Sequence, residues 1–225
     1  MKKTMLIPVL LVFTGLLFTE SSEAQEQENN SSFSVSSTFA SNYVWRGSNY
    51  GNGPHIQPQV SFSTGGLTLG VWGSFDFSGY KEADPFLSYS FPFGLSLGFT
   101  DYYYPGLSFF ETSVEDGSHA FELNGSYSTG GLSLSANYII NEAGGAASMG
   151  GDLYFQAGYE FKSFNIFAGA GNGWHTTDGE FDLCNIGIGT DATIEITEKF
   201  SLPVSGQVIL NPDREQLYLV VSVSF

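Results

Sequence analysis

Few residues in this sequence could carry out catalysis, and they are scattered along the chain. The candidates for a general base are His55, His119 and His175, and the candidate for a thiol nucleophile is Cys184. A hydrolase needs its nucleophile within hydrogen-bond reach of a base. Serine is so abundant here that a serine close to one histidine is weak support. We therefore predict that the protein is not an enzyme and that Cys184 is a lone, unpaired thiol.

One polar segment contains residue types that bind metal ions. His175, Asp178, Glu180 and Asp182 follow one another closely, and imidazole and carboxylate groups are ligands for divalent cations. Their spacing matches no metal-binding motif, and we favour the interpretation that they form an acidic, solvent-exposed loop. The glycines are spread through the chain and form no phosphate-binding motif. The sequence thus predicts no metal and no cofactor.

The composition excludes several other classes of protein. There are 7 Lys+Arg against 23 Asp+Glu, a net charge of -16, so the chain lacks the basic face that a nucleic-acid-binding protein needs. Hydrophobic residues (42%) and aromatic residues (16%) are too frequent for a disordered acidic chain. Charged residues make up only 13%, about half of what a soluble domain uses. The outside of the protein must therefore differ from an ordinary aqueous surface.

The N-terminal segment has the features of a secretory signal peptide. Lys2 and Lys3 precede an apolar run from Met5 to Phe18, and Ser22-Glu23-Ala24 forms a small-x-small cleavage site. A transmembrane helix is less suitable because it needs about 20 apolar residues, and this run is shorter and contains a proline. We predict a signal peptide (residues 1–24), a periplasmic tail (25–32) and a folded domain (33–225).

Apolar and polar side chains alternate along the rest of the chain. From Phe33 the apolar positions continue at Val35, Phe39, Tyr43 and Trp45, which is the pattern of a strand with one apolar face. No window shows a sustained helical period. The predicted strands, about twelve, cover residues 33–45, 56–62, 67–77, 87–91, 95–104, 121–127, 132–140, 153–161, 164–174, 186–196, 200–210 and 217–225.

Short turns and longer loops alternate between these strands. The short turns lie at residues 63–66, 91–94, 128–131, 161–163 and 197–199. The longer, more polar links cover residues 47–54, 78–84, 105–118, 141–151, 175–185 and 211–216. In an antiparallel structure this alternation places all the long loops at one end, opposite both termini.

The character of the polar face favours a membrane-embedded β-structure over a soluble one. A soluble sandwich or barrel turns its apolar face inward and covers the outside with charged residues. Here one face is rich in Ser, Thr, Asn, Gln and Gly, and the other in Phe, Tyr, Leu and Val. An outer-membrane barrel has an apolar band towards lipid, a polar lumen, short periplasmic turns and long extracellular loops. We predict an all-β, antiparallel transmembrane β-barrel in the bacterial outer membrane.

The last predicted strand supports this placement. Its apolar positions are Leu217, Leu219, Val221, Val223 and Phe225, so the chain ends on an aromatic residue. This ending resembles the C-terminal signal that the bacterial barrel-assembly machinery recognises. The expected partners are that machinery, outer-membrane lipid and small hydrophilic solutes, with no nucleic acid.

The first half of the chain also resembles a family, the TorF-type porins. The residues that carry the resemblance are Ser41-Asn42-Tyr43-Val44-Trp45-Arg46-Gly47, Pro54-His55-Ile56-Gln57, Gly70-Val71-Trp72-Gly73-Ser74, Glu82-Ala83-Asp84, Tyr102-Tyr103-Tyr104-Pro105-Gly106 and Glu122. Past Tyr138 only the strand pattern matches. The resemblance implies a porin-like outer-membrane barrel and brings no agreed substrate.

The predicted lumen contains many carboxylates and a single basic side chain, Arg46. Its extracellular half is expected to hold Arg46, Trp72, Asp76, Glu82, Asp84, Tyr102, Tyr104 and Glu122, and the further lumen carboxylates are Asp152, Glu160, Asp191 and Glu195. One hypothesis is a constriction where Arg46 faces a surplus of carboxylates and selects solutes by charge and hydrogen bonding. The alternative is that Arg46 and one carboxylate form a structural ion pair that braces or plugs the lumen.

The expected size of the barrel suits small solutes. Twelve strands about 4.8 Å apart and tilted about 40° give a backbone diameter near 24 Å, of which side chains leave about 10 Å. An acid-rich wall predicts a preference for cations or neutral solutes in a passive channel. Two other functions stay open: a structural or adhesive barrel with a closed lumen and partner-binding loops, and a soluble exported β-sandwich such as a lectin.

Overall fold

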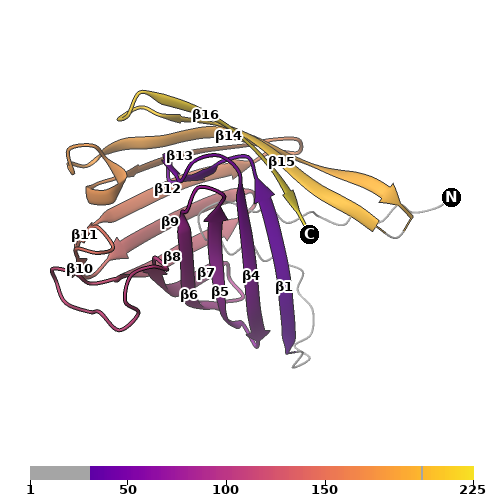
Figure 1. The fold of residues 1–225 in the computed structure, drawn as a ribbon. Helices are drawn as coiled ribbons and strands as arrows, with labels where there is room; N and C mark the ends of the chain where they lie inside the picture. Colours follow the sequence, from indigo (N-terminus) through magenta and orange to yellow (C-terminus); the bar gives the residue numbers. More distant parts are fainter. Residues whose placement is uncertain (1–30, 199) are drawn as a thin grey trace.

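The alternating segments form strands that pair with their neighbours in the sequence. A computed structural model describes residues 31–198 and 200–225, in which twelve antiparallel strands close into a barrel (Figure 1). The wall strands are β1 (Ser32–Ala40), β4 (His55–Thr64), β5 (Leu67–Asp76), β6 (Lys81–Ser90), β7 (Leu95–Tyr103), β8 (His119–Thr129), β9 (Leu132–Ile139), β12 (Leu153–Glu160), β13 (Asn165–Gly171), β14 (Asp182–Thr197), β15 (Phe200–Asn211) and β16 (Gln216–Ser224). The predicted all-β barrel of twelve strands is confirmed. The predicted signal peptide lies outside the described residues, as does nearly all of the predicted tail.

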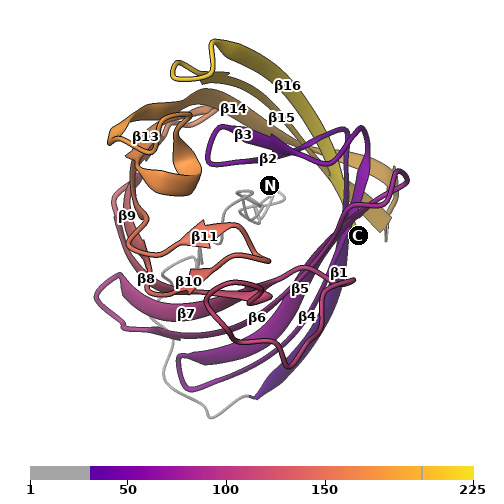
Figure 2. The same cartoon turned by 60° about the vertical axis from the view of Figure 1, so that its left-hand side comes forward.

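Three small elements belong to the long loops and not to the wall. They are the hairpin β2 (Tyr43–Trp45) and β3 (Ser48–Tyr50), the hairpin β10 (Glu142–Ala143) and β11 (Ser148–Met149), and the 3-10 turn η1 (Gly173–His175). Figure 2 shows both hairpins inside the ring of wall strands. Within the described ranges, no helix has the length and apolar character needed to cross a membrane.

The three largest errors in the predicted boundaries each have a physical reason. The first strand was expected to run to Trp45, but β1 ends at Ala40 and the chain turns inward at Ser41 and Asn42. The alternation continues through Tyr43 and Trp45 because these side chains are buried in the lumen. Strand β6 begins at Lys81 and β14 at Asp182, several residues before the expected starts, because these polar segments pair with β5 and β13.

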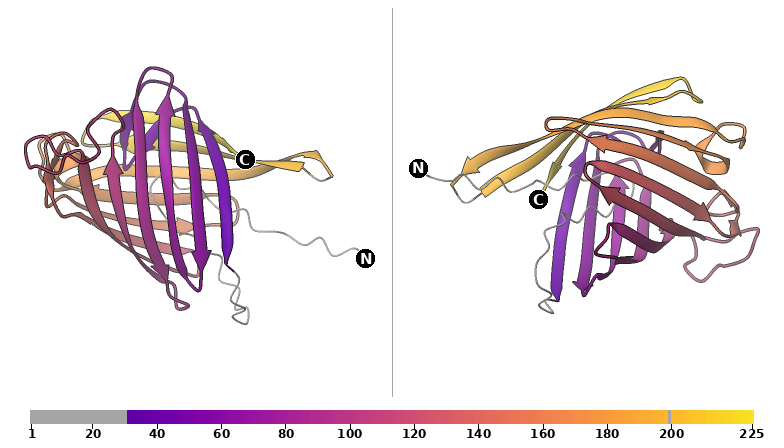
Figure 3. Two further views of the ribbon diagram at one scale, coloured as in Figure 1. Left: turned by 60° about the horizontal axis from the view of Figure 1, so that its bottom comes forward. Right: turned by 180° about the vertical axis from the view of Figure 1, so that it is seen from behind.

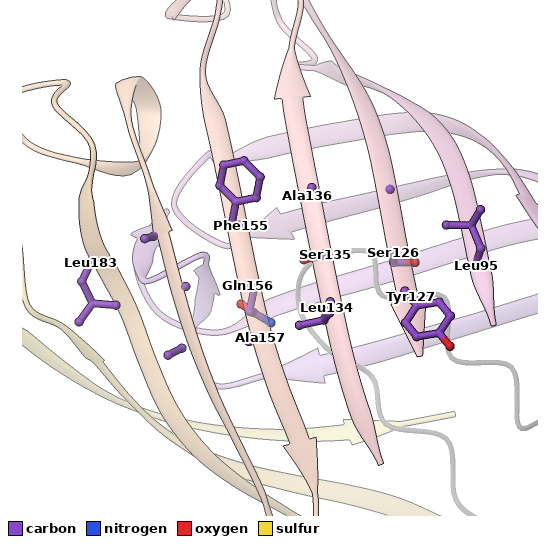
Figure 4. Close-up of a pocket in the computed structure, with 14 residues that line it drawn as sticks. Leu95, Ser126, Tyr127, Leu134, Ser135, Ala136, Phe155, Gln156, Ala157 and Leu183 are labelled. Carbon is purple, nitrogen blue, oxygen red and sulfur yellow. The ribbon is translucent and has the colours of Figure 1, made fainter. Parts of the chain in front are cut away.

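The outer face of the wall is a continuous apolar surface. Val60 on β4 pairs with Val71 on β5, and both side chains are more than two-fifths exposed. A shallow depression of about 640 Å³ lies on this face. Figure 4 shows Leu134, Phe155 and Leu183 around small side chains such as Ala157. None of the residues that line it is charged. Such a surface favours contact with lipid acyl chains over contact with water.

The strands β14 and β15 extend beyond the wall as a two-stranded ribbon (Figure 3). Strand β14 pairs with β13 only as far as Gly189, and β15 pairs with β16 only from Val204 onward, whereas β14 and β15 remain paired to Thr197↔Phe200. Side chains on both faces of the ribbon are exposed between Thr193 and Thr197. The predicted lumen carboxylate Glu195 lies on this ribbon, past the closed part of the barrel.

A charged residue on the outer face tests whether lipid covers it. Val71→Arg is expected to lower the free energy of unfolding from lipid vesicles by about 2–4 kcal/mol, because it places a guanidinium among acyl chains near mid-height of the wall. The matched control is Gln59→Arg on the neighbouring strand, which faces the lumen and is expected to change the stability by about 0.5 kcal/mol. Equal losses in urea titrations of the two variants would contradict a lipid-facing outer wall.

Candidate functional site

A buried ion pair fixes the tip of the β2–β3 hairpin across the lumen. Arg46 Nη1 lies 2.6 Å from Glu122 Oε1, and Arg46 Nη2 lies 2.9 Å from Glu122 Oε2, which gives a bidentate pair. The two side chains are 8% and 0% exposed. Glu122 Oε2 also accepts hydrogen bonds from the Tyr102 hydroxyl at 2.7 Å and from Asn124 Nδ2 at 2.8 Å. Protein donors therefore satisfy both oxygens of this carboxylate, as a buried charge requires.

Two aromatic rings enclose the guanidinium of Arg46. Its Cζ atom lies 4.4 Å from the ring centroid of Trp45 and 4.6 Å from that of Tyr154. Tyr154 belongs to the wall strand β12, and its hydroxyl donates to Gln156 Oε1 at 2.6 Å and accepts from Asn185 Nδ2 at 2.9 Å. Cation–π contacts are strongest where water is excluded, so these rings hold the charge in place together with Glu122.

Aromatic side chains fill the lumen around this ion pair. The buried members of the cluster include Tyr43, Trp45 and Tyr102, and partly buried members pack against them. We call this group the lumen plug; its aromatic members are Tyr43, Trp45, Tyr50, Trp72, Tyr80, Tyr102, Tyr104 and Trp174. It combines side chains of the wall with side chains of inward-folded loops. The estimated gap of about 10 Å is therefore not available at this level of the barrel.

Two neighbouring carboxylates on β6 lie at the edge of the lumen plug. Glu82 and Asp84 are 3% and 1% exposed. Glu82 Oε2 accepts a hydrogen bond from the Tyr80 hydroxyl at 2.8 Å, and Asp84 Oδ1 accepts one from the backbone N–H of Tyr103 at 3.4 Å. Both residues face the lumen as predicted, from a strand instead of the loop that was expected there.

Asp76 has a different role from the one proposed from the sequence. Its carboxylate accepts hydrogen bonds from the backbone N–H groups of Asn52 at 2.8 Å, Ser78 at 2.9 Å, Gly79 at 2.7 Å and Tyr80 at 2.7 Å. These bonds tie together the loops that follow β3 and β5. The structure therefore places Asp76 at a loop junction and not opposite Arg46.

The opposite side of the hairpin is fastened to the wall. Asn211, the last residue of β15, is fully buried and donates from Nδ2 to the backbone oxygen of Gly47 at 2.9 Å. Gly47 has a φ of +83° and lies directly against the backbone oxygen of Cys184 on β14. Val44 packs with Phe167 and Ile209 of the wall in a second buried cluster. The hairpin thus bridges the lumen from β14 and β15 to Glu122 on β8.

The remaining loops close over the plug. His175 in η1 is 1% exposed and packs against the rings of Trp45 and Tyr154. Burial, and next the positive charge of Arg46, hold the pKa of His175 well below its ordinary value, so the ring is neutral. Burial, together with the charge of Glu122, raises the pKa of Asp152. Trp174 donates from its indole N–H to the backbone oxygen of Ala147, which joins η1 to the β10–β11 loop.

The other predicted lumen carboxylates are not brought to this site. Glu160 and Glu195 are exposed, and Asp191 is partly buried at the level where β14 pairs with Ser205. Of the twelve predicted residues, the structure gathers Arg46, Trp72, Glu82, Asp84, Tyr102, Tyr104, Glu122 and Asp152 around the plug. Glu160, Asp191 and Glu195 share the lumen-facing alternation of the gathered residues, but they lie further along their strands, away from the plug.

His119 and Cys184 occupy structural positions, whereas His55 Nδ1 lies 2.9 Å from the buried hydroxyl oxygen of Ser74. His119 Nδ1 lies 2.9 Å from Asp101 on the outer face, and its Nε2 lies 2.6 Å from the backbone oxygen of Phe109. Both ring nitrogens are therefore used, and neither pairs with a serine. Cys184 is a buried free thiol. Among residues 31–198 and 200–225 there is no group of three or more His, Cys, Asp or Glu placed to hold a metal ion.

The sequence analysis did not identify several residues of this site. Tyr154 packs against Arg46, and His175 packs against Trp45 and Tyr154, but the sequence analysis assigned neither residue to the lumen. The parity of Tyr154 on β12 does point inward, since Phe155 beside it is exposed. Asn211 lay in a predicted loop, and only the long-range contact with Gly47 reveals its role.

Comparison with solved structures finds similarity to porins. A mutant porin of Rhodopseudomonas blastica has 16% sequence identity, with 76% of this chain and 55% of that chain covered and a TM-score of 0.41. OccK8 (OprE) of Pseudomonas aeruginosa has 18% identity, with 86% and 62% covered and a TM-score of 0.40. The chain spans about half the length of the porins it matches first. The sequence matches no protein-family model and no curated protein.

These similarities are too distant to identify a function. The closed barrel of this chain is established by its own strand registers, from β1↔β16 round to β1↔β4. The resemblance to TorF-type porins stays a prediction.

Proposed function

We propose that the protein is an outer-membrane, porin-like channel whose extracellular half is narrowed by the lumen plug. The observation that carries the proposal is the inward hairpin whose tip residue, Arg46, is locked onto Glu122 inside a closed barrel. An apolar outer wall and a Ser-, Thr- and Asn-rich inner wall suit a polar path through lipid. The plug limits this path to small hydrophilic solutes.

The charges of the inner wall favour cations or neutral solutes over anions. Glu122 neutralises Arg46, so the basic group of the lumen is already paired. Acidic residues outnumber basic ones 23 to 7 in the sequence, and the more exposed lumen carboxylates Glu160 and Asp191 form no ion pair among the described residues. A wall with unpaired acidic groups attracts cations and repels anions.

Conductance measurements and liposome-swelling assays test the proposed channel. Purified protein in a planar lipid bilayer is expected to show a conductance well below that of an unplugged barrel of the same strand number. A potassium chloride gradient is expected to give a reversal potential of the sign that marks cation preference. Liposomes that contain the protein should swell in small sugars or amino acids but not in larger oligosaccharides. An anion-selective reversal potential would contradict the proposed selectivity.

A second function, a closed structural or adhesive barrel, is favoured by the near-complete burial of the plug. Tyr43, Trp45 and Glu122 are at most 6% exposed, so the described lumen side chains leave little room at that level. The loop after β7 also carries the exposed side chains Phe109, Phe110 and Val114, which could contact a partner. The absence of both conductance and swelling would select this function over a channel.

A further inference from the structure

A separate polar pocket lies between the inward hairpin and the turn that joins β15 to β16. Its volume is about 400 Å³, within the range of small-molecule sites. In Figure 2 the β2–β3 hairpin lies beside β15 and β16, at the end of the barrel that carries the long loops. The lining residues are Ser48, Asn49, Tyr50, Arg214, Gln216 and Tyr218. Tyr50 also packs against the lumen plug, whereas the other five residues lie outside the Arg46–Glu122 site.

Arg214 is the charged group of this pocket, and its charge is not matched by an acidic partner. The ion pairs among the described residues are Arg46–Glu122 and His119–Asp101, so Arg214 takes part in neither. Its Nε atom is buried and has no hydrogen-bond partner within the same part of the chain. A guanidinium with no protein acceptor favours a ligand that offers an acceptor to its accessible nitrogens.

The acidic neighbours of Arg214 are directed elsewhere. The carboxylate of Asp213 accepts hydrogen bonds from the backbone N–H of Thr177 at 2.8 Å and from its hydroxyl at 3.0 Å. Glu215 is exposed. The guanidinium is therefore left free to bind an external acceptor.

The other walls of the pocket suit a ligand rich in hydroxyl groups. Tyr50 and Tyr218 supply rings with polar ends, and the Tyr218 hydroxyl donates to Gln216 Oε1. The side-chain amides of Asn49 and Gln216 and the hydroxyl of Ser48 offer both donors and acceptors. A tyrosine offers an apolar ring face and a polar hydroxyl, so these walls suit a ligand that has both a ring and hydroxyl groups.

We propose that this pocket binds a sugar acid, with the ligand carboxylate on Arg214 and its hydroxyl groups on the surrounding amides and tyrosines. A planar guanidinium matches a carboxylate with two parallel hydrogen bonds. The protein carries a net charge of -16, which opposes a dianion such as phosphate more strongly than a monoanion. The proposal concerns the extracellular surface and does not depend on whether the lumen conducts.

The test uses the folded, detergent-solubilised protein and three probes: glucuronate, glucose and inorganic phosphate. Titration calorimetry is expected to show binding of glucuronate, weaker binding of phosphate and no measurable binding of glucose. Arg214→Gln is expected to weaken glucuronate binding by at least about tenfold, because a charge-assisted hydrogen-bond pair is lost. The matched control is Lys162→Gln, an exposed cation in a short turn at the other end of the barrel, which should leave binding unchanged.

A second variant keeps the test decisive if Arg214→Gln does not fold. Asn49→Asp alters an exposed side chain of the pocket and places a negative charge beside the ligand carboxylate, so it should weaken glucuronate binding by a similar factor. Each of three results would overturn the proposal: no binding of glucuronate to the unaltered protein, equal binding of glucose, or tighter binding of phosphate. Unchanged binding in folded Arg214→Gln protein would do the same.

Discussion

Replacing Arg46 with alanine is expected to raise the single-channel conductance severalfold. The change leaves the fully buried carboxylate of Glu122 without its cation, which costs about 3–5 kcal/mol in a buried pair. It also removes the group that Trp45 and Tyr154 enclose. The tip of the hairpin then loses its ion pair with β8, so states in which the hairpin leaves the lumen become populated. Planar-bilayer recording measures the result directly.

Two further variants show whether the ion pair itself closes the lumen. Lys81→Ala removes an exposed cation at the start of β6, near the same end of the barrel, and should leave the conductance unchanged. Changing Arg46 and Glu122 together to methionine removes both charges and keeps side-chain volume, so closure should largely return, because two apolar groups can replace a buried pair. A conductance that is the same in Arg46→Ala as in the unaltered protein would show that the pair is not a gate.

The strands of the wall could be predicted because their pattern is local. A wall strand has lipid on one side and polar groups on the other, so each strand shows the two-residue alternation by itself. Val60 and Val71 need no knowledge of their partners to be assigned to the outer face. The alternation of short turns and long loops likewise follows from the sequence alone.

The lumen plug could be predicted only in part because its contacts join distant segments. Arg46 and Glu122 were both expected in the extracellular half, yet the bidentate bond between them depends on an inward fold of the first long loop. That fold is hidden in the sequence, since Tyr43 and Trp45 continue the alternation of β1. An aromatic residue in a barrel sequence can face lipid or fill a lumen, and only the closure of the barrel decides.

The hairpin contacts the wall at an irregularity in strand pairing. The alternation of apolar and polar residues does not reveal this irregularity. The pairing of β13 with β14 shifts between Gly169 and Ala170, so Cys184 is an extra residue in the register. Such a bulge bends the strand and redirects its backbone groups. The backbone oxygen of Cys184 thereby meets Gly47 at the tip of the hairpin.

A single methyl group at the contact between Gly47 and Cys184 should displace the hairpin from the wall. In Gly47→Ala the added Cβ would overlap the backbone oxygen of Cys184, and the backbone φ of +83° also disfavours any residue with a Cβ. The wall strand cannot retreat without breaking its pairing, so the hairpin must move. We expect loss of the Asn211 hydrogen bond to Gly47 and a severalfold higher conductance than that of the unaltered protein.

Gly53→Ala separates the steric overlap from the backbone strain. Gly53 belongs to the same long loop and has a φ of +90°, but an added Cβ there meets nothing within 4 Å. Both variants should lose about 1–2 kcal/mol of stability from the left-handed backbone. Only Gly47→Ala should lose more than this and also open the lumen. If the two variants have the same unfolding free energy and the same conductance, the tip of the hairpin is not held against β14, and closure must depend on the Arg46–Glu122 pair alone.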